Sequence, residues 1–240
     1  MYEIEGYFDS TYIDFSIKEN RVKAIEKMKK LSSNPYRVTW QFEQALCDYT
    51  GAPYAVAVNS CTAALLLAVQ WHTQGPYYFH EDSFDMDTVE IPRHTYVSVP
   101  CAIKMAGARV TWRDDDWRGS YQLKPLPVCD CARRFTSGMY IAGQFQCVSF
   151  SASKILGAEQ GGAILHDNAE ADAYFRRMRF DGRTEGVDAM EDTFDLVGHH
   201  CLMLPSVAAT LLVRLYHLPK HNEDLPEREY PDLSLHPAFR

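Results

Sequence analysis

Lys154 is the residue whose type and position most directly suggest chemistry. It lies in the segment QCVSFSASKILGAEQGGAIL at 146–165, between two apolar runs that are typical of strands and ahead of three glycines that are typical of a turn. Most lysines are solvated surface charges. A lysine between buried strands is instead partly desolvated, which lowers its pKa and leaves a neutral amine for Schiff-base formation. The segment therefore predicts a carbonyl cofactor bound at Lys154.

The turn formed by Ser60, Cys61 and Thr62 is a second candidate. An alternating apolar run at 54–58 precedes it, and residues 63–71 are strong helix formers. A strand, a hydroxyl-rich turn and a helix together collect phosphate, because free backbone N–H groups and the positive end of the helix dipole point toward the turn. Ser and Thr are also preferred N-cap residues, so the same pattern fits a plain helix cap.

Asp130 is a carboxylate that follows a short apolar run at 126–129. Predicted strands alternate with predicted helices along the chain, which indicates an α/β fold with a parallel sheet. In such folds, ligands bind at the carboxyl ends of the strands. Asp130 and Lys154 both belong to this edge of the predicted sheet.

The elements that must position these residues follow from apolar periodicity and turn residues. We expect helices over 18–31, 40–49, 63–71, 96–106, 169–180 and 207–218, and strands over 54–58, 89–91, 108–112 and 126–129, besides the two around Lys154. An acidic loop is expected over 186–195. The tail from residue 219, rich in Pro, Glu and Asp, is expected to be extended and poorly packed.

Composition disfavours several classes of partner. The 240-residue chain has 24 basic and 32 acidic residues, a formal net charge of −8, so its overall field does not attract nucleic acid or an anionic membrane. Arginines cluster at 133–134 and 176–183, where they form either a solvated helix face or a local anion site. We find no secretory leader pattern and no apolar stretch that approaches the roughly 20 residues of a membrane span.

The cysteines and acidic residues do not form a metal-binding pattern. Seven cysteines occur without the paired spacing of zinc sites, and Cys129 and Cys131 would point to opposite faces of a strand. The acidic run at 114–116 is predicted to be an exposed turn. We therefore expect no metal and a cytoplasmic protein with reduced cysteines.

Pyridoxal phosphate is the carbonyl cofactor that these residue types fit. An enzyme that uses it needs an amine, a carboxylate that keeps the pyridine nitrogen protonated, a phosphate cup and a flat group against the ring. Lys154 can supply the amine, Asp130 the carboxylate and Tyr96 the flat face. The hydroxyl-rich turn at 60–62 can supply the phosphate cup.

Six segments of the chain closely resemble the DegT/StrS family of pyridoxal-phosphate-dependent nucleotide-sugar aminotransferases. They are FEQALCDYTGAPYAVAVNSCTAALLLAV at 42–69, IPRHTYVSVPCAIKMAGA at 91–108, VCDCA at 128–132, SFSASK at 149–154, EQGGAIL at 159–165 and RMRFDGR at 177–183. The resemblance implies the aspartate aminotransferase fold, fold type I. It also implies an entry segment over 1–39, a cofactor-binding large domain over 40–184, and a reduced C-terminal domain and tail over 185–240.

The family's motifs also imply roles, position by position. By resemblance, the cofactor-binding residues are Ser60, Cys61, Thr62, Tyr96, Asp130, Ser149, Lys154 and His200. Asp130 and Lys154 are the catalytic residues among them, as the pyridine-nitrogen partner and the Schiff-base lysine. Ser149 is similar to a second phosphate-binding hydroxyl, and Cys61 stands where the family usually has glycine.

The chain departs from the family pattern at other positions too. Arg133 replaces a His or Gln that usually follows the aspartate by three residues, and only 109–129 stand where family members carry an additional strand and helix. An Asn-x-Arg-Met element that reaches a neighbouring subunit's cofactor appears here as residues 200–203. Arg133 and Arg183 are candidate substrate-binding residues.

The resemblance implies a homodimer with a shared active site, in which His200 or an arginine of 176–183 reaches the neighbour's phosphate. A polar turn before the last helix is the alternative explanation of His200.

The activity implied is transfer of an amino group from an amino donor, usually glutamate, to a keto group of a nucleotide-linked sugar or similar acceptor. Another reaction of the same cofactor, such as elimination or group transfer on a modified nucleotide, fits the same residues. A third hypothesis is a non-catalytic relative that binds cofactor or a partner. The presence of both Asp130 and Lys154 argues against it, because a pure binder needs no electron sink.

Overall fold

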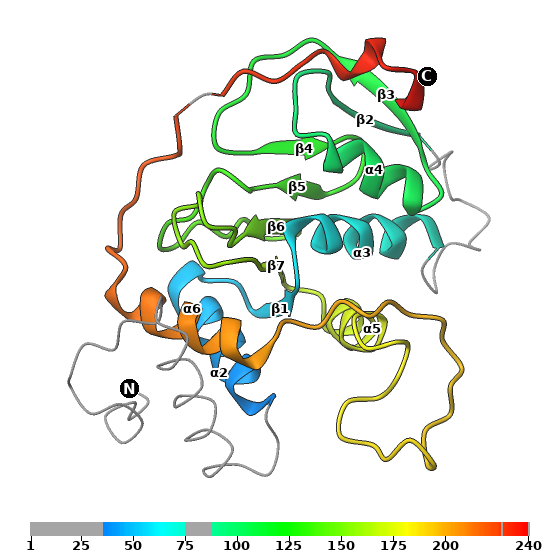
Figure 1. Ribbon diagram of the computed structural model, residues 1–240, viewed down its shortest axis with the longest axis vertical. Helices are drawn as coiled ribbons and strands as arrows, with labels where there is room; N and C mark the ends of the chain where they lie inside the picture. The colour runs from blue at the N-terminus through cyan, green and yellow to red at the C-terminus, as the bar shows by residue number, and fades with distance from the viewer. Residues whose placement is uncertain (1–35, 75–87, 227, 240) are drawn as a thin grey trace.

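The computed structural model describes residues 36–74, 88–226 and 228–239, in which helices pack on both faces of a central sheet (Figure 1). The helices are α2 (Arg37–Thr50), α3 (Cys61–Gln74), α4 (Ser98–Met105), α5 (Ala169–Met178) and α6 (Pro205–His217), with short 3-10 helices at Leu233–Leu235 and Pro237–Phe239. The strands are β1 (Tyr54–Val58), β2 (Thr88–Pro92), β3 (Arg109–Arg113), β4 (Tyr121–Leu123), β5 (Val128–Asp130), β6 (Phe145–Ser149) and β7 (Gly162–His166). The expected helix at 18–31 lies outside the described residues, and the other expected helices and strands are confirmed, most of them with shifted ends.

The sheet is mixed, so the expectation of a parallel sheet is wrong. The larger sheet has the strand order β1-β7-β6-β5-β4, and β2 pairs with β3. The pairs β5–β6 and β2–β3 are parallel, whereas β7 is antiparallel to both of its neighbours and β4 is antiparallel to β5. The connection from β6 to β7 over 150–161 contains no helix. A parallel pair would need such a crossover.

The short strand β4, which the apolar pattern does not predict, links the two sheets. The N–H of Glu90 in β2 donates to the carbonyl of Lys124 at 2.7 Å, and the N–H of Lys124 donates back to the carbonyl of Glu90 at 3.1 Å. On its other edge β4 pairs with β5. It therefore lies between β5 and β2 and comes from the stretch where the sequence is shorter than the family pattern.

Alternating side chains of the strands fill two cores, one on each face of the sheet. Val56 and Val58 of β1 pack in the first core with α3, α4 and α5, whereas Ala55 and Ala57 pack in the second core with α2 and α6. This alternation is expected because successive strand residues point to opposite faces. Helix α6 thus shares a core with α2, while the domain boundaries at 39/40 and 184/185 stay a prediction.

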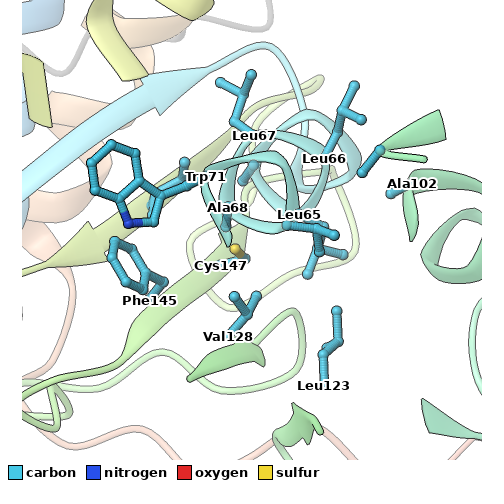
Figure 2. Packing of buried hydrophobic residues seen from close by; sticks show 14 of the residues in the cluster. Leu65, Leu66, Leu67, Ala68, Trp71, Ala102, Leu123, Val128, Phe145 and Cys147 are labelled. Atoms are coloured by element: carbon cyan, nitrogen blue, oxygen red, sulfur yellow. The ribbon is translucent and has the colours of Figure 1, made fainter. Parts of the chain in front are cut away.

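Helix α3 is buried on all sides, which holds the turn at its N-terminus in place. Every residue from Ala64 to Trp71 is buried. Figure 2 shows Leu65 and Trp71 in the same cluster as Phe145 and Cys147 of the sheet. A helix without a polar face must be covered by its neighbours, here the sheet, α4 and α5.

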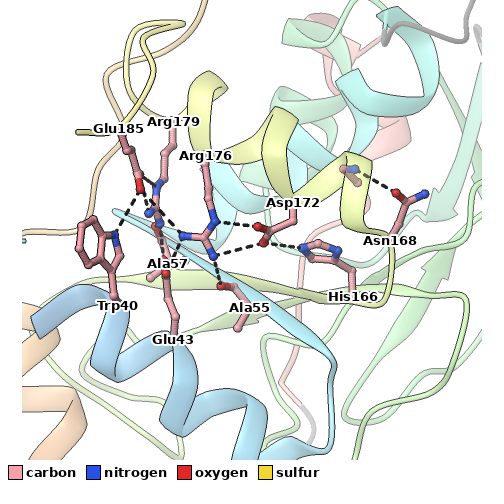
Figure 3. A network of polar contacts seen from close by, with 11 residues as sticks. Trp40, Glu43, Ala55, Ala57, His166, Asn168, Asp172, Arg176, Arg179 and Glu185 are labelled. Carbon is pink, nitrogen blue, oxygen red and sulfur yellow. Dashed lines mark hydrogen bonds and ion pairs between the residues drawn. The ribbon is translucent and has the colours of Figure 1, made fainter. Parts of the chain in front are cut away.

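Charged side chains, rather than another strand, close the outer edge of β1 (Figure 3). Glu43 of α2 accepts a hydrogen bond from the N–H of Ala57 at 2.9 Å, and Arg179 donates to the carbonyl of Ala57 at 2.6 Å. Arg176 of α5 donates to the carbonyl of Ala55 at 3.5 Å and to Glu43 at 2.8 Å. A free strand edge invites pairing with another chain, so these side chains block that edge while they anchor α2 and α5.

Two arginines of the cluster at 176–183 are held in ion pairs by these contacts. Arg179 is 1% exposed and forms ion pairs with Glu43 and, at 2.7 Å, with Glu185. Arg176 also pairs with Asp172 at 2.7 Å. The interpretation as a solvated helix face is therefore wrong for Arg179, whose charge is neutralised inside the protein.

We expect Glu43→Gln to lower the free energy of unfolding by about 3 kcal/mol, because it leaves buried Arg179 short of a counter-charge. Burial acts to raise the pKa of Glu43, but the charges of Arg179 and Arg176 outweigh it and hold this pKa below 4.5. A carboxyl with a lowered folded-state pKa stabilises the fold above its unfolded pKa, and this contribution disappears as the pH falls through the folded pKa. Urea unfolding curves of the wild type and the variant should therefore converge in acid.

Asp48→Asn is the matched control for this variant. Asp48 is exposed on the same helix, so its change should stay within about 0.5 kcal/mol. Equal losses in the two variants would contradict the structural role given to Glu43.

The tail from residue 219 is extended over 219–226 and 228–231, as expected, but it is anchored to the domain at several points, where the expectation of poor packing is wrong. It runs along the domain from α6 to the β2–β3 end of the sheet (Figure 1, orange to red). Leu233 and Phe239 are buried, and Asp224 forms an ion pair with Arg134 at 2.8 Å. The tail has few apolar residues, but these pack on the domain and its backbone groups hydrogen-bond to it. Composition alone does not indicate such contacts.

Candidate active site

Lys154 lies in the loop between β6 and β7 and is partly buried. The backbone N–H of Lys154 donates to the carbonyl of Ser151 at 2.9 Å, which holds the loop in a tight turn. Burial lowers the pKa of the Lys154 ammonium group, the charge of Asp130 opposes this shift, and the charge of Arg133 adds to it. The prediction of a partly desolvated lysine with a lowered pKa is confirmed.

Asp130 ends β5 and is 5% exposed. Its Oδ1 accepts a hydrogen bond from the N–H of Ala132 at 2.9 Å, and its Oδ2 accepts one from the hydroxyl of Tyr121 at 3.0 Å. The Tyr121 hydroxyl also contacts Oγ1 of Thr95 at 2.5 Å. Burial raises the pKa of Asp130, although both hydrogen bonds and the charge of Lys154 work in the opposite direction. A cation beside this carboxylate would relieve the cost of burying it.

Cys61 lies in the same electrostatic environment as these two residues. Burial raises the pKa of its thiol well above 9.0, the charge of Asp130 adds to this shift, and Lys154 opposes it. Its Sγ is 3.5 Å from the carbonyl oxygen of Cys147 in β6. Cys147 is also the register partner of Asp130, so the N-terminus of α3 lies at the carboxyl ends of β5 and β6, and Lys154 belongs to the loop that follows β6.

The hydroxyl-rich turn lies against the two glycines at the start of β7. Ser60 forms a bridge with Gly161, and Ser149 of β6 pairs with Gly162. A Cβ on Gly162 would lie 2.4 Å from the backbone N of Cys61, so the close approach requires glycine. Ser60 and Ser149 thus lie on two sides of the same glycine pair.

This donor set fits a phosphate group. Ser60 Oγ accepts a hydrogen bond from the N–H of Ala63 at 3.1 Å, which confirms the helix-cap interpretation. The first N–H groups of a helix have no partner within it, so those of Cys61 and Thr62 remain for an anion. The Thr62 hydroxyl donates to Oγ of Ser98 at 2.9 Å and keeps its acceptor capacity. Capping and phosphate binding are therefore compatible here.

Tyr96 lies in the turn before α4, and its side chain is 56% exposed. The preceding residue, Thr95, contacts Tyr121, which in turn binds Asp130. Tyr96 is therefore connected to the Asp130 side of the site, and its role as the stacking ring stays a prediction.

Of the remaining predicted residues, Arg133 follows Asp130 by three residues, and its charge contributes to the lowered pKa of Lys154. Arg183 and His200 have other surroundings. The guanidinium group of Arg183 lies 4.9 Å from the ring centre of Phe180, and Nδ1 of His200 lies 2.9 Å from Asp181 Oδ2. Their roles in a substrate site or at a neighbouring subunit stay predictions.

Sequence reasoning misses Tyr121, the hydrogen-bond partner of Asp130. The alternation of Tyr121, Gln122 and Leu123 is a strand signal, but three residues are too few to separate it from a loop. Its side chain reaches Asp130 only because β4 is antiparallel to β5, in a register that places Tyr121 opposite Asp130.

The described residues show neither a membrane-spanning helix nor a metal cluster. No helix among them is long and apolar enough to cross a bilayer. No group of three or more His, Cys, Asp or Glu residues in the same ranges is arranged to hold a metal ion. All seven cysteines are free.

Comparisons with solved structures support the fold. Helicobacter pylori PseC, described as an aminotransferase of pseudaminic acid biosynthesis, aligns with 76% of this chain at 18% identity and a TM-score of 0.59. AtS13 from Actinomadura melliaura aligns with 76% at 21% identity and a TM-score of 0.64. The sugar aminotransferase CalS13 from Micromonospora echinospora aligns with 87% at 19% identity and a TM-score of 0.65. The chain spans 58%, 60% and 67% of these three structures.

Family models give a more specific result. No curated protein sequence gives a significant match. The model of the DegT/DnrJ/EryC1/StrS aminotransferase family, however, matches residues 15–141 and 136–228. The fold is therefore the fold type I of enzymes that depend on pyridoxal phosphate, and the chain belongs to the DegT/DnrJ/EryC1/StrS aminotransferase family.

Proposed function

We propose that this protein is a pyridoxal-phosphate-dependent aminotransferase. It moves an amino group from an amino acid, with glutamate as the expected donor, to a keto group of a nucleotide-linked sugar or similar acceptor. The observation that carries the proposal is that Asp130 ends β5 and Lys154 lies in the loop after the parallel neighbour β6, with the pKa of Lys154 lowered mainly by burial. The family match and the likeness to sugar aminotransferases support the same conclusion.

The residues of the chain have distinct tasks in this proposal. Pyridoxal phosphate, when bound, supplies an electron sink for the substrate Cα carbanion. Lys154 would hold the cofactor covalently through its Nζ and, once released by the amino donor, would move the proton to and from the substrate Cα. Its lowered pKa increases the fraction of neutral amine that can accept this proton.

Asp130 would hold the pyridine nitrogen in its protonated form. Its carboxylate is oriented by Tyr121 and Ala132, and its burial makes a cationic partner favourable. The hydroxyls of Ser60, Thr62 and Ser149, with the N–H groups at the start of α3, would bind the cofactor phosphate. The exposed ring of Tyr96 would cover the cofactor ring.

We also propose a homodimer in which the neighbouring subunit completes the site. His200 is exposed and can reach a second copy, whereas Arg183 is half-buried and pairs with Asp192 at 3.7 Å, so His200 is the stronger candidate for this contact. An isologous dimer is the commonest way to bury such a shared site. Light scattering on the cofactor-loaded protein should give twice the 27.4 kDa of one chain, and an active monomer would refute a shared site.

The function is tested by adding glutamate to the cofactor-loaded protein and recording the absorbance spectrum. The expected result is loss of the visible band as the cofactor takes up the amino group. Mass spectrometry of products from a panel of keto nucleotide sugars would then identify the acceptor. A band that no amino acid changes would instead support the non-catalytic relative. Release of an eliminated or transferred group would support another reaction of the same cofactor.

A further inference from the structure

The chain after α6 crosses the residues that follow β5. We refer to residues 222–226 and 228–232 as the C-terminal strap. The N–H of Leu225 donates to the carbonyl of Arg133 at 2.9 Å, and Arg133 donates through Nη2 to the carbonyl of Pro226. Arg134 forms a bidentate ion pair with Asp224, at 3.0 and 2.8 Å. The first half of the strap is therefore fixed beside the residues just beyond Asp130.

The second half of the strap is fixed beyond β2. Nδ1 of His94 lies 3.0 Å from the carbonyl oxygen of Tyr230. The ring of Tyr230 stacks on Trp117 with centroids 6.1 Å apart, and Trp117 packs against Tyr121 at 4.7 Å. Tyr121 donates its hydrogen bond to Asp130. A continuous series of contacts therefore joins the strap to the catalytic carboxylate.

Arg228 lies on the strap between these two anchors. Its guanidinium group is exposed, 5.9 Å from the ring centre of Tyr230. Burial is the main cause of the lowered pKa of Lys154, Asp130 opposes the shift, and the charges of Arg133 and Arg228 add to it. The geometry agrees with this ordering, since Arg133 donates to the carbonyl of Pro226, two residues before Arg228 on the strap.

Arg133 follows the buried Asp130 by three residues and binds the strap next to Arg228, so the strap gathers two arginines beyond the end of β5, in a chain whose net charge is −8. Within the ranges that the structure describes, neither Arg133 nor Arg228 forms an ion pair with a carboxylate. Like charges at close range repel, and a bound anion removes that cost. Guanidinium groups suit carboxylate and phosphate oxygens because they can donate two parallel hydrogen bonds.

We propose that Arg228, together with Arg133, binds an anionic group of the substrate beside Lys154. The group is the carboxylate of the amino donor or a phosphoryl group of a nucleotide-linked acceptor, which present the same anionic oxygens. This inference rests on the proposed function. That function assigns the cofactor phosphate to the hydroxyl-rich turn on another element, which leaves the two arginines for the substrate. The C-terminal strap is then a part of the substrate site that no motif of the sequence indicates.

Binding to the cofactor-loaded protein, measured by titration calorimetry, tests this role without turnover. Glutarate serves as a non-reacting dicarboxylate probe for the donor, and UDP and dTDP serve as probes for the acceptor. Arg228→Gln is expected to weaken binding of one of these classes by about 10- to 100-fold, the loss of a charge-assisted contact. Arg228→Lys should recover part of that loss, and affinity for pyridoxal phosphate should change by less than about twofold.

Arg37→Gln is the matched control, since Arg37 is exposed in the first turn of α2 and the variant removes the same charge. It should leave every affinity unchanged. Loss of glutarate binding alone assigns the donor, and loss of nucleotide binding alone assigns the acceptor. The inference is overturned if the wild type binds neither class, if Arg228→Gln binds both as the wild type does, or if its affinity for pyridoxal phosphate falls equally. A protein that loses anion binding in Arg228→Gln but never transaminates would refute the proposed function alone.

Discussion

Lys154→Ala is expected to abolish covalent attachment of pyridoxal phosphate and to lower turnover by about 10⁴-fold or more, the upper range for loss of a general base. The variant removes both the amine that holds the cofactor and the group that moves the proton at the substrate Cα. Reduction with borohydride followed by mass spectrometry should label the wild type at residue 154 and leave the variant unlabelled. Non-covalent cofactor binding should persist, because the hydroxyl-rich turn and Asp130 remain.

Lys220→Ala is the matched control for the lysine. Lys220 is exposed, and its backbone carbonyl, which the variant keeps, accepts hydrogen bonds from Ser137, Thr136 and Tyr49. This variant should be labelled and should turn over as the wild type does. A borohydride-reducible yellow adduct that survives in Lys154→Ala would show that another lysine carries the cofactor.

Asp130→Asn is expected to leave the cofactor bound and to lower turnover by at least about 10²-fold, since the neutral amide no longer stabilises a protonated pyridine nitrogen. The same variant should not lower the stability of the fold, although it lowers turnover. Burial raises the pKa of Asp130 above 3.8 in the folded protein. The cofactor-free fold therefore loses stability as the pH rises from the unfolded pKa through the folded pKa and the carboxylate ionises. The cofactor-free variant should therefore unfold at neutral pH at a urea concentration no lower than the wild type.

Tyr121→Phe separates the charge of Asp130 from its orientation. It keeps the carboxylate and removes one hydrogen bond to Oδ2, so its rate should fall by no more than about tenfold. Both variants can be assayed by the absorbance change on addition of glutamate. Unchanged turnover in Asp130→Asn would mean that another carboxylate contacts the cofactor.

The fold illustrates which features are encoded locally. The strand before Ser60, the helix after it and the loop that carries Lys154 are contiguous segments with strong apolar and glycine signals, and the structure confirms each of them. The direction of β7, in contrast, is not encoded locally. Alternation along a strand is the same in parallel and antiparallel sheets, so the pattern at 162–166 could not show that β7 is antiparallel to both neighbours.

The candidate site also combines residues that local sequence indicates with contacts that only the tertiary structure shows. The sequence by itself was enough to propose roles for Lys154, Asp130 and the turn at 60–62, because each residue ends or follows a predictable element and matches a family motif. Only the tertiary structure decided what surrounds them. Asp224 binds Arg134 across 90 residues, and Arg179 binds Glu43 across 136. Such contacts depend on strand order and on the course of an irregular tail, and no periodicity in the sequence records either of them.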